Sequence, residues 1–539
     1  MSAAPTTAAP TGRKKLAQGK EQGGSGVPPL SQHKQQRRDA SATLGHETQS
    51  TLSPAGAKES DTLPKDWRWV TLGDVTESMK NGIYKPASSY AEDGLACLRM
   101  YNIGEGRIVW RDIKRMRLSE DEIREYELLP GDLLVNRVNS RELVGKAVAI
   151  PAGLERCVFE SKNIRVRIRH DLVLPEFVSY RLLSAGSRYF TQNAQQVVGM
   201  ASISQPQVGR FPVPLPPLPE QRRIVTEIEK QFTRLEAGVA ALRRVQVNLK
   251  RYRAAVLKAA CEGRLVPTET ELFKVAAASR RSPAGKQSRD GSATFETGEA
   301  LLARILTERR QNWQGHGQYK EPAATDTTGL PKLPEGWVWA SAEQICSTVA
   351  SGSTPSADQL FQRDGEIPFI KVYNLTFGGP LDFSVKPTFI SRIIHEGRLG
   401  RSKAFPGDVL TNIVGPPLGK VSIVPDRFPE WNINQAIVVF RPTEAISNRL
   451  LAFWLRSEGV LARLDRTAKA TAGQFNIQVT TCRKLALPVP PLSEQTRVVA
   501  EVERRLSVVE ELDAVVSANL QRAIRLRQSI LQKAFTGQL

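Results

Sequence analysis

Short polar segments rich in Asn, Gln, Lys and Arg follow apolar runs along this chain. The clearest is VNRVNSRELVGK at 135–146, where Asn and Arg interleave with apolar residues after a predicted strand. Arg and Lys donate hydrogen bonds to guanine edges and to phosphates, whereas Asn and Gln pair with adenine edges. Loops of this composition could therefore hold and discriminate nucleic acid, provided that folded elements bring them onto one surface.

The candidates for nucleic-acid contact share a polar or cationic side chain in a predicted loop. In the first half of the chain they are Lys80, Asn81, Tyr84, Lys85, Asn102, Arg137, Asn139, Arg141, Lys162 and Asn163. In the second half they are Ser351, Ser353, Thr354, Asn374, Asn412, Lys420, Asn434, Gln435, Gln474 and Asn476. Each could instead be a solvated loop residue or a turn former, as Asn often is.

Two pairs of matched residues favour a scaffold role instead. Tyr101-Asn102 recurs as Tyr373-Asn374 at the equivalent position of the second half. Two halves that bind different bases should differ where they touch those bases. We therefore expect the divergent loops, rather than these matched pairs, to determine specificity.

The charge of the chain points to a polyanionic partner. Its 75 Lys and Arg outnumber its 55 Asp and Glu, which gives a net charge of +20. Residues 1–62 contribute little of this excess, so most of it lies in the regions predicted to fold. Nucleic acid is the first candidate for such a partner.

Sequence motifs for catalysis are missing. No Gly-rich phosphate loop ends in GK[ST], and no acidic residue or Asn precedes a Pro-Pro-aromatic run of the kind found in amino-methyltransferases. The five His and five Cys are scattered, so we expect neither a metal site nor a disulfide framework. No apolar run reaches the ~18 residues of a membrane span, and we expect a cytoplasmic protein.

The chain repeats itself once over most of its length. LPKDWRWVTLGDV (63–75) matches LPEGWVWASAEQI (333–345), and PPLPEQRRIV (216–225) matches PPLSEQTRVV (490–499). The match continues without gaps until VLKAACEGRL (256–265) aligns with ILQKAFTGQL (530–539). One unit is therefore used twice, and each copy should fold alike.

Each unit should contain an α/β domain and a long helix. GDLLVNRV (131–138) and GDVLTNIV (407–414) predict a turn followed by a strand, and 175–190 and 447–464 have helical spacing. After each PPLxEQ junction, apolar residues recur at steps of three, four and seven, which predicts a helix with a narrow stripe that needs a partner. Gly263 and Gly537 follow these two segments, and we expect them to be the C-caps of the helices. In the first copy the stripe comprises Ile228, Phe232, Leu235, Val239, Leu242, Leu249, Tyr252 and Val256; in the second, Val502, Leu506, Val509, Val516, Leu520 and Ile530. Asp513 and Arg527 interrupt the second stripe, so we expect imperfect packing there.

These patterns predict a mixed α/β protein with a pseudo-two-fold internal repeat. We expect two similar domains separated by two long helices in an antiparallel coiled coil. The predicted parts are a disordered tail at 1–62, a first domain at 63–218, a first long helix at 219–265, a central linker at 266–332 with one short helix at 297–313, a second domain at 333–491, and a second long helix at 492–539. Two such domains on a fixed spacer should recognise a split nucleic-acid site.

The paired PPLxEQ junctions, the LPxxWxW openings, the PGDxLxN strands and the terminal KAFTGQL resemble the specificity subunit of type I restriction-modification systems. LLARILTERRQNW (301–313) is also similar to that family's central conserved region. The resemblance covers about 63–539, and the N-terminal extension departs from the family's usual start, so its role stays open.

The resemblance implies a non-catalytic subunit whose two target-recognition domains each recognise half of a bipartite sequence in double-stranded DNA. It also implies methyltransferase subunits, two in number, docked on the paired helices, and restriction subunits that join them. S-adenosylmethionine, Mg²⁺ and ATP are then expected on those partners and not on this chain. The alternatives are the specificity subunit of another bipartite-site restriction system, a structural coiled-coil interaction protein, and a self-sufficient methyltransferase.

Overall fold

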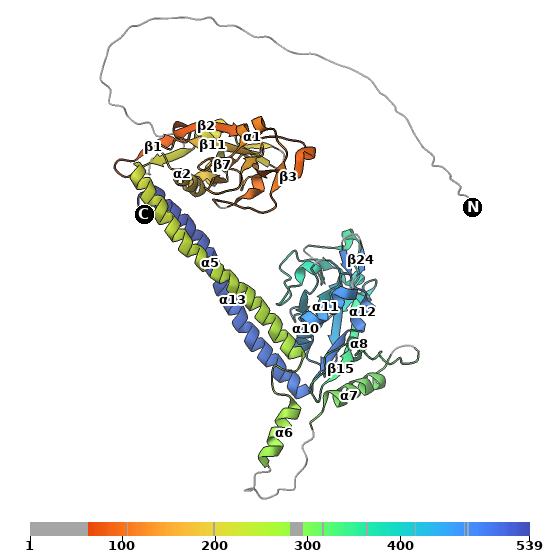
Figure 1. The fold of residues 1–539 in the computed structure, drawn as a ribbon. Helices are drawn as coiled ribbons and strands as arrows, with labels where there is room; N and C mark the ends of the chain where they lie inside the picture. The colour runs from red at the N-terminus through yellow and green to blue at the C-terminus, as the bar shows by residue number, and fades with distance from the viewer. Residues whose placement is uncertain are drawn as a thin grey trace, which may run out of the picture. The chain divides into compact units, whose positions relative to one another are not determined.

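The computed structural model describes residues 63–539 apart from 105, 198–199, 281–294, 315–316, 363–364, 416, 468 and 472–473. The tail predicted to be disordered, at 1–62, lies outside the described residues, as does 281–294 of the predicted central linker. The described residues form two α/β domains and two long helices (Figure 1). No helix among the described residues combines the length and apolar character needed to span a membrane.

Domain 1 begins with the strand that follows the LPxxW opening and ends at the first PPLxEQ junction. Its elements are β1 (Arg68–Thr71), β2 (Thr76–Asn81), β3 (Tyr90–Leu98), β4 (Ile103–Gly104), β5 (Arg107–Ile108), β6 (Lys114–Met116), α1 (Glu120–Tyr126), β7 (Leu133–Asn136), β8 (Val138–Asn139), β9 (Ala147–Ala149), β10 (Cys157–Phe159), β11 (Asn163–Ile168), α2 (Pro175–Arg181), the short π-helix η4 (Leu182–Gly186), α3 (Ser187–Asn193), β12 (Gln195–Val197), β13 (Met200–Ser202), α4 (Gln205–Gly209) and β14 (Pro212–Leu215).

Domain 2 follows the same plan. Its elements are β15 (Val338–Ser341), α8 (Ala342–Ile345), β16 (Cys346–Ser351), β17 (Ile367–Ile370), β18 (Phe389–Ile390), α9 (Arg392–Glu396), β19 (Lys403–Ala404), β20 (Val409–Asn412), β21 (Val421–Ile423), β22 (Trp431–Ile433), β23 (Ile437–Pro442), α10 (Asn448–Arg456), α11 (Glu458–Thr467), β24 (Lys469–Thr471), β25 (Gln474–Asn476), α12 (Val479–Arg483) and β26 (Ala486–Val489).

The same sheet lies at the centre of both domains. Domain 1 has the strand order β2-β11-β7-β9 and domain 2 the equivalent order β16-β23-β20-β21, and neighbouring strands are antiparallel in both. A second sheet in each domain includes one parallel pair, β3 with β10 and β17 with β22. The predicted mixed α/β class is therefore confirmed for both domains.

The predicted Pro-Gly-Asp turns feed the central strands β7 and β20. Gly131 and Gly407 adopt φ values of +88° and +89°, a conformation that favours glycine. The aspartate that follows accepts the backbone N–H two residues before its glycine, at 2.8 Å in both domains. That buried carboxylate also meets an arginine of the neighbouring strand: Arg167 at 2.9 Å from Asp132, and Arg441 at 2.8 Å from Asp408.

An antiparallel strand pair closes each domain where the chain enters and leaves it. β1 pairs with β14, and β15 pairs with β26. The Trp of each LPxxW opening then donates its indole N–H to the Glu of the PPLxEQ junction. Trp67 Nε1 lies 3.0 Å from Glu220 Oε2, and Trp337 Nε1 lies 2.9 Å from Glu494 Oε1. Two motifs about 150 residues apart in sequence are thus one contact in space.

The Gln of each PPLxEQ junction connects the long helix to its own domain. Gln221 and Gln495 are 0% and 1% exposed. Their side-chain oxygens accept the N–H of Leu174 and of Ser447, at the starts of α2 and α10, both at 2.9 Å. Their amide nitrogens each donate to a backbone carbonyl of the domain and to the carbonyl of the first proline of the junction. The Gln of the repeated PPLxEQ motif therefore has a structural role in both copies.

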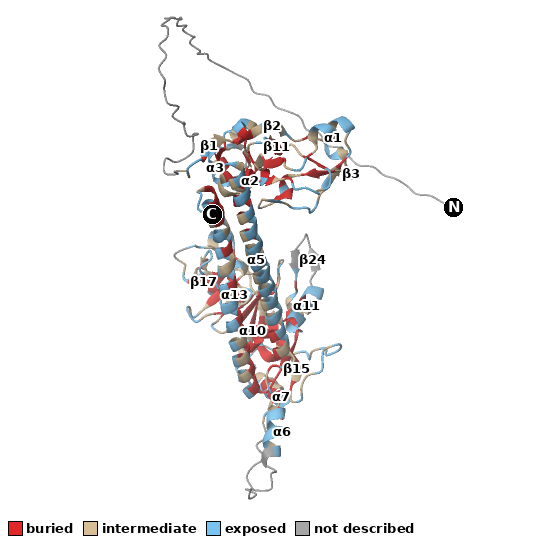
Figure 2. Ribbon diagram, turned by 60° about the vertical axis from the view of Figure 1, so that its left-hand side comes forward, coloured by how far each residue is buried: buried red, intermediate tan, exposed pale blue. Residues whose placement is uncertain are grey.

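The two long helices are α5 (Leu218–Cys261) and α13 (Leu492–Phe535), each of 44 residues. Gly263 and Gly537 follow them with φ of +64° and +70°, so the predicted glycine C-caps are confirmed. Buried residues recur on α13 at steps of seven: Val502, Val509, Val516, Ala523 and Ile530. α5 and α13 lie side by side in both ribbon views (Figures 1 and 2), although their outward faces are exposed.

Contacts between α5 and α13 show that they run in opposite directions. Arg527, near the end of α13, stacks over Phe232, near the start of α5, with its guanidinium 4.6 Å from the ring centroid. Arg527 also lies 3.8 Å from Glu236. Arg253, near the end of α5, lies 3.5 Å from Glu510, in the first half of α13. Arg527 was expected to spoil the packing, but its guanidinium covers an aromatic ring instead.

One residue of the predicted stripe faces solvent. Tyr252 is 46% exposed, because the inward positions here are the half-buried Leu249 and Arg253 and the buried Val256. The hydrophobic stripe of α5 is also weaker in its middle than at its ends, where Ile228 and Val256 are buried. The central part of the pair therefore relies on half-buried residues of α5 and on the buried Val509 and Val516 of α13.

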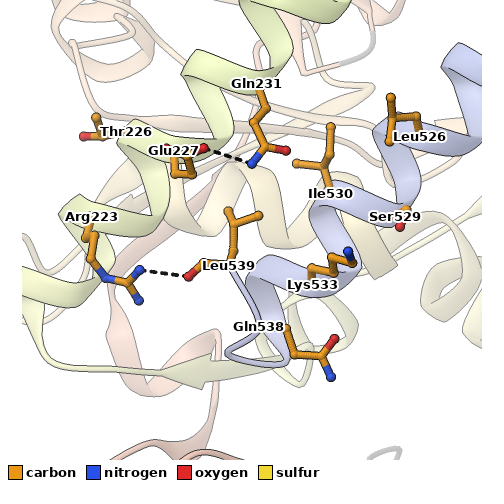
Figure 3. A pocket seen from close by; sticks show the side chains of 10 residues that line it. All are labelled: Arg223, Thr226, Glu227, Gln231, Leu526, Ser529, Ile530, Lys533, Gln538 and Leu539. Carbon is orange, nitrogen blue, oxygen red and sulfur yellow. Dashed lines mark hydrogen bonds between the residues drawn. The ribbon is translucent and has the colours of Figure 1, made fainter.

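Each domain packs against one end of both helices. The core of domain 1 includes Ile224 and Ile228 of α5 together with Ile530 and Phe535 of α13. The core of domain 2 includes Val498 and Val502 of α13 together with Val256 and Ala260 of α5. A cavity of about 610 Å³ lies where α5 begins and α13 ends, and Arg223 donates to the Leu539 carbonyl across it at 2.8 Å (Figure 3).

The central linker holds two described helices where one was predicted. α7 (Gly298–Gln311) matches the predicted short helix, and its Leu301 and Ile305 enter the core of domain 2. α6 (Glu269–Arg280) was not predicted. Its start has a capping box, because Thr268 Oγ1 accepts the Glu271 N–H at 3.1 Å and the Glu271 carboxylate accepts the Thr268 N–H at 2.9 Å. The TETE sequence at 268–271 was the missed signal.

The indole–carboxylate contact should stabilise domain 2 more than domain 1, because Glu494 is 0% exposed and the Glu220 side chain is 32% exposed. Trp337→Phe leaves a buried carboxylate without one of its donors and should lower the free energy of unfolding by about 1–3 kcal/mol. Trp67→Phe should cost less. Urea unfolding of the full chain compares them, with the exposed Trp110→Phe as control. An equal cost for all three variants would contradict this assignment.

Candidate nucleic-acid interface

One edge of the central sheet gathers the polar segments of domain 1. In the strand register, Asn81 at the end of β2 lies opposite Ile164, and Asn136 at the end of β7 lies opposite Asn163 at the start of β11. The ends of these three neighbouring strands therefore meet at the same edge. The predicted polar loops that follow β2 and β7 and precede β11 consequently share one surface.

A hairpin from the segment 195–202 joins this edge. β13 pairs with β12 and with β8, and Ala201 lies opposite Asn139. Ile203 N donates to the Arg137 carbonyl at 2.9 Å, and Arg137 N donates to the Lys162 carbonyl at 2.8 Å. The candidates of 135–141 and 162 are thus brought beside the hairpin.

The domain 1 edge surface is defined here as Asn81, Tyr84, Arg137, Arg141 and Lys162. Asn81, Tyr84 and Arg141 are exposed, with Tyr84 at 84%, while Arg137 and Lys162 are half-buried. The surface combines two guanidinium groups, an ammonium group, an amide and an aromatic ring. That composition suits phosphate contact, base-edge hydrogen bonding and stacking together.

Domain 2 builds an equivalent edge from different side chains. Ser351 at the end of β16 lies opposite Val438, and Asn412 at the end of β20 lies opposite Ile437, the first residue of β23. The β24–β25 hairpin reaches the same edge, because Asn476 bridges to Val414 and Ile477 N donates to the Ile413 carbonyl at 2.9 Å.

The domain 2 edge surface is defined here as Ser351, Ser353, Thr354, Asn434, Gln435 and Asn476. Gln435 and Asn476 are exposed and the others are half-buried. Gln474 lies in β25, but its side chain is outside the described part of the chain. This surface has amides and hydroxyls where domain 1 has cations, so two similar frameworks present different hydrogen-bonding groups.

Five predicted asparagines use their side chains inside the domains. They are Asn102, Asn139, Asn163, Asn374 and Asn412, between 0% and 8% exposed. Asn102 Nδ2 donates to the Val109 and Arg111 carbonyls at 3.0 Å, and Asn374 Nδ2 donates to the Asp382 and Val385 carbonyls at 3.0 and 2.8 Å. The scaffold role expected for the matched Tyr-Asn pairs is confirmed for the two asparagines, whereas Tyr101 and Tyr373 are 65% and 37% exposed.

The other three buried asparagines make hydrogen bonds that stabilise the chain at the edges of the two central sheets. Asn139 Nδ2 donates to Asn136 Oδ1 at 2.8 Å, and Asn163 Nδ2 donates to the Leu98 carbonyl at 3.2 Å. Asn412 Oδ1 accepts the Lys420 N–H at 3.0 Å. In this structure their amides face the interior, because each satisfies backbone groups that would otherwise be buried unpaired. Contact between these three amides and DNA stays an untested prediction, and it would require them to turn outward.

Three predicted lysines already have partners within the protein. Lys80 pairs with Glu125 and lies 5.1 Å from the Tyr126 ring centroid, and Lys85 lies 2.5 Å from Glu122. Lys420 Nζ donates to the Val372 carbonyl at 3.3 Å. Exposed ion pairs contribute little and exchange readily, so Lys80 and Lys85 stay available to a phosphate.

One residue that the sequence did not single out by itself belongs to the domain 1 edge. Gln205, the first residue of α4, donates from Nε2 to Asn81 Oδ1 at 3.1 Å and so orients that exposed amide. The polar segment 199–207, which contains Gln205, matched 471–478 in position. That match was the available signal, but only the fold shows which strand end the segment meets.

A cluster of possible metal ligands lies elsewhere in domain 2. His395, Glu396 and Glu430 place ligand atoms within 4.8 Å of one another. Lys403 Nζ lies 2.6 Å from Glu396, and Arg392 lies 3.2 Å from Glu430. Burial and the nearby Lys403 lower the pKa of His395. Because two cations already balance the carboxylates, these residues form an ion-pair network.

Comparison with known proteins gives a consistent answer. Residues 64–241 and 334–505 each match the family described as the type I restriction modification DNA specificity domain. The chain is 23% identical over 483 residues to the type I restriction enzyme EcoKI specificity subunit of Escherichia coli strain K12, which covers 88% of this chain and 90% of that subunit. It is 27% identical over 483 residues to the EcoBI specificity subunit of Escherichia coli, with 87% and 86% covered.

A solved structure concerned with complex assembly and conformational transition of the type I R-M system contains a chain with a similar fold. The TM-score is 0.56 at 20% identity, and the alignment covers 89% of this chain and 100% of that one. At this identity the likeness concerns the fold.

If the domain 1 edge surface binds DNA, Arg141→Ala should weaken duplex binding by the full chain about tenfold, because an exposed guanidinium leaves the surface. Fluorescence anisotropy at several salt concentrations measures the affinity and its salt dependence. Arg117→Ala is the matched control, since Arg117 is an exposed guanidinium that does not belong to the edge surface and pairs with Asp93 at 2.9 Å. Equal losses for both variants, or no loss for Arg141→Ala, would argue against this surface.

Proposed function

Because the chain belongs to the type I restriction-modification DNA specificity family, we propose that it is the specificity subunit of such a system and has no catalytic site of its own. Each α/β domain recognises one half of a bipartite sequence in double-stranded DNA. The observation that carries this proposal is the pair of edge surfaces, built at equivalent strand ends from non-equivalent side chains. A shared framework with different contact groups is what recognition of two different half-sites requires.

The proposal gives α5 and α13 the role of a spacer. We infer that they form an antiparallel coiled coil, supported by the seven-residue recurrence of buried residues on α13 and by the opposed contacts of Arg527 and Arg253. Each helix is connected to its domain by a buried Gln, so the helix length sets the distance between the edge surfaces. In this scheme the gap between half-sites follows from the number of residues in the helices.

The same helices offer a surface for further subunits. Val508, Leu512 and Val515 recur at steps of four and three on α13 and are 47–57% exposed. Such a stripe suits a partner helix. The proposed partners are methyltransferase subunits, two in number because the unit is repeated, and restriction subunits that join them. S-adenosylmethionine, Mg²⁺ and ATP would be bound by those partners and not by this chain.

Exchange of one domain tests the assignment of half-sites. Replacing 76–210 with the matching segment of a related specificity subunit keeps β1, β14 and the PPLxEQ junction, so the closure of domain 1 is retained. Methylome sequencing of a host with the active complex should show a change in one half of the methylated motif. Replacing 346–484 is the reciprocal control and should change the other half. A change in both halves from either exchange would contradict independent recognition.

An inserted heptad tests the spacer. Seven extra residues in each helix, near 242–249 and 516–523, lengthen the pair by about 10 Å and keep the same face inward. At about 3.4 Å per base pair, the gap should grow by roughly three base pairs. The duplex also rotates over those base pairs, so methylation at the longer gap by this variant should be weaker than methylation at the original gap by the parent chain.

The control for the spacer is an insertion of four residues in each helix. This insertion turns the apolar stripe away from the partner helix and should destabilise the protein. Methylome sequencing of the heptad strain measures the gap directly. Strong methylation at the unchanged gap would show that the helices do not set the distance.

A further inference from the structure

At one aligned position, the ends of the two long helices carry side chains of very different size. ILQKAFTGQL at the end of α13 has Phe535 where VLKAACEGRL at the end of α5 has Cys261. Phe535 is 3% exposed in domain 1, and its ring meets Phe177 edge-on at 5.1 Å. The repeat therefore allows the surroundings of a phenyl ring in domain 1 to be compared with those of a thiol in domain 2.

In domain 1 aromatic rings surround a guanidinium group. Arg181 lies 5.4 Å from the centroid of Trp69 and 5.7 Å from those of Phe211 and Phe535. Its Nε donates to the Pro212 carbonyl of β14 at 3.2 Å. Contacts of this kind between a cation and ring faces are favourable, most of all away from water.

Domain 2 places a guanidinium group against the equivalent carbonyl but lacks most of the rings. Arg463 of α11 donates to the Ala486 carbonyl at 3.0 Å, and Ala486 occupies in β26 the place of Pro212 in β14. Trp339 stands where Trp69 does in the paired strand. Phe211 is replaced by Leu485 and Phe535 by Cys261. Two of the three rings are therefore absent around this second guanidinium.

A cavity of about 330 Å³ occupies this place in domain 2. Its lining includes Cys261, Trp339, Arg463, Val460, Pro331 and Pro488. Arg463 Nε is buried and has no hydrogen-bond partner among the described residues. Lys258, Glu262 and Glu458 also line the cavity, and with Arg463 they balance two positive charges against two negative ones.

We propose that this cavity is a binding site for a small, uncharged, planar aromatic molecule. The ring would lie over the Arg463 guanidinium beside Trp339 and fill the space that Phe535 fills in the other repeat. The size is sufficient for one or two fused rings, since apolar cavities of roughly 150 Å³ bind benzene. The balanced charge of the lining favours a neutral ligand over an anionic or a cationic one.

Occupancy of the site would affect the joint between α5 and domain 2. The cavity lies between Cys261, the last residue of α5, and Val460 of α11 and Trp339 of β15. A ring placed there contacts all three elements at once. A ligand that binds only the folded state raises its stability in proportion to the logarithm of ligand concentration.

Indole is a suitable probe, and calorimetric titration and thermal unfolding of the full chain are the measurements. We expect saturable binding of one indole per chain and a melting temperature that rises with indole concentration. Cys261→Phe supplies the missing ring covalently and should weaken indole binding at least tenfold. Benzoate and benzylamine, as charged single rings, should bind more weakly than indole.

Two further variants keep the test decisive if Cys261→Phe fails to fold. Cys261→Leu fills part of the cavity and should weaken indole binding by a smaller factor. Phe535→Leu is the matched control, because it alters the equivalent position of the other repeat and should leave the affinity of the Cys261 site unchanged. Absence of saturable indole binding, or equal affinity for the parent chain and the Cys261 variants, would overturn the proposal.

Discussion

In each domain, a hydrogen bond from an indole N–H to a carboxylate joins the point where the chain enters the domain to the point where it leaves. The position of the long helix relative to its domain depends on this contact. The chain enters a domain at LPxxW and leaves it at PPLxEQ, and Trp67–Glu220 and Trp337–Glu494 join these two points. A donor to an ionised acceptor is among the stronger hydrogen bonds of a protein interior. Burial raises the pKa of Glu494, while the Glu269 N–H and the Trp337 indole stabilise its charged form. The next residue, a buried Gln, holds the start of α2 or α10, so the long helix leaves its domain in a defined direction.

Reciprocal packing follows from that fixed direction. α5 starts in the core of domain 1 and ends in the core of domain 2, and α13 does the reverse. The buried residues of α5 are therefore concentrated where the helix meets a domain, and the middle of the pair depends on half-buried positions of α5 and on the buried Val509 and Val516 of α13. Arg527 shows how an apparent defect in a stripe is accommodated, since its planar guanidinium packs on the Phe232 ring while its charge meets Glu236.

The edge surfaces can diverge because the framework beneath them does not depend on them. Asn102 and Asn374 bind backbone carbonyls inside their domains, and Asp132 and Asp408 hold the turns that lead to the central strands. The exposed side chains at the strand ends make none of these hydrogen bonds. The same separation appears at the helix ends, where Cys261 stands in the place of Phe535 without loss of the fold and lines a cavity.

The sequence by itself determined the mixed α/β class, the repeat, the two long helices and their glycine caps, because these follow from periodicity and from backbone preferences that act over a few residues. It also indicated Asn102 and Asn374 as scaffold, since both halves retain them. Only the tertiary structure decided which candidates share a surface, because strand register joins Asn81, Arg137 and Lys162 from segments far apart in the chain. It also decided which asparagines face inward, the pairing of Trp337 with Glu494, and the stacking of Arg527 on Phe232. These features depend on distances between segments, and no local pattern of residues encodes such distances.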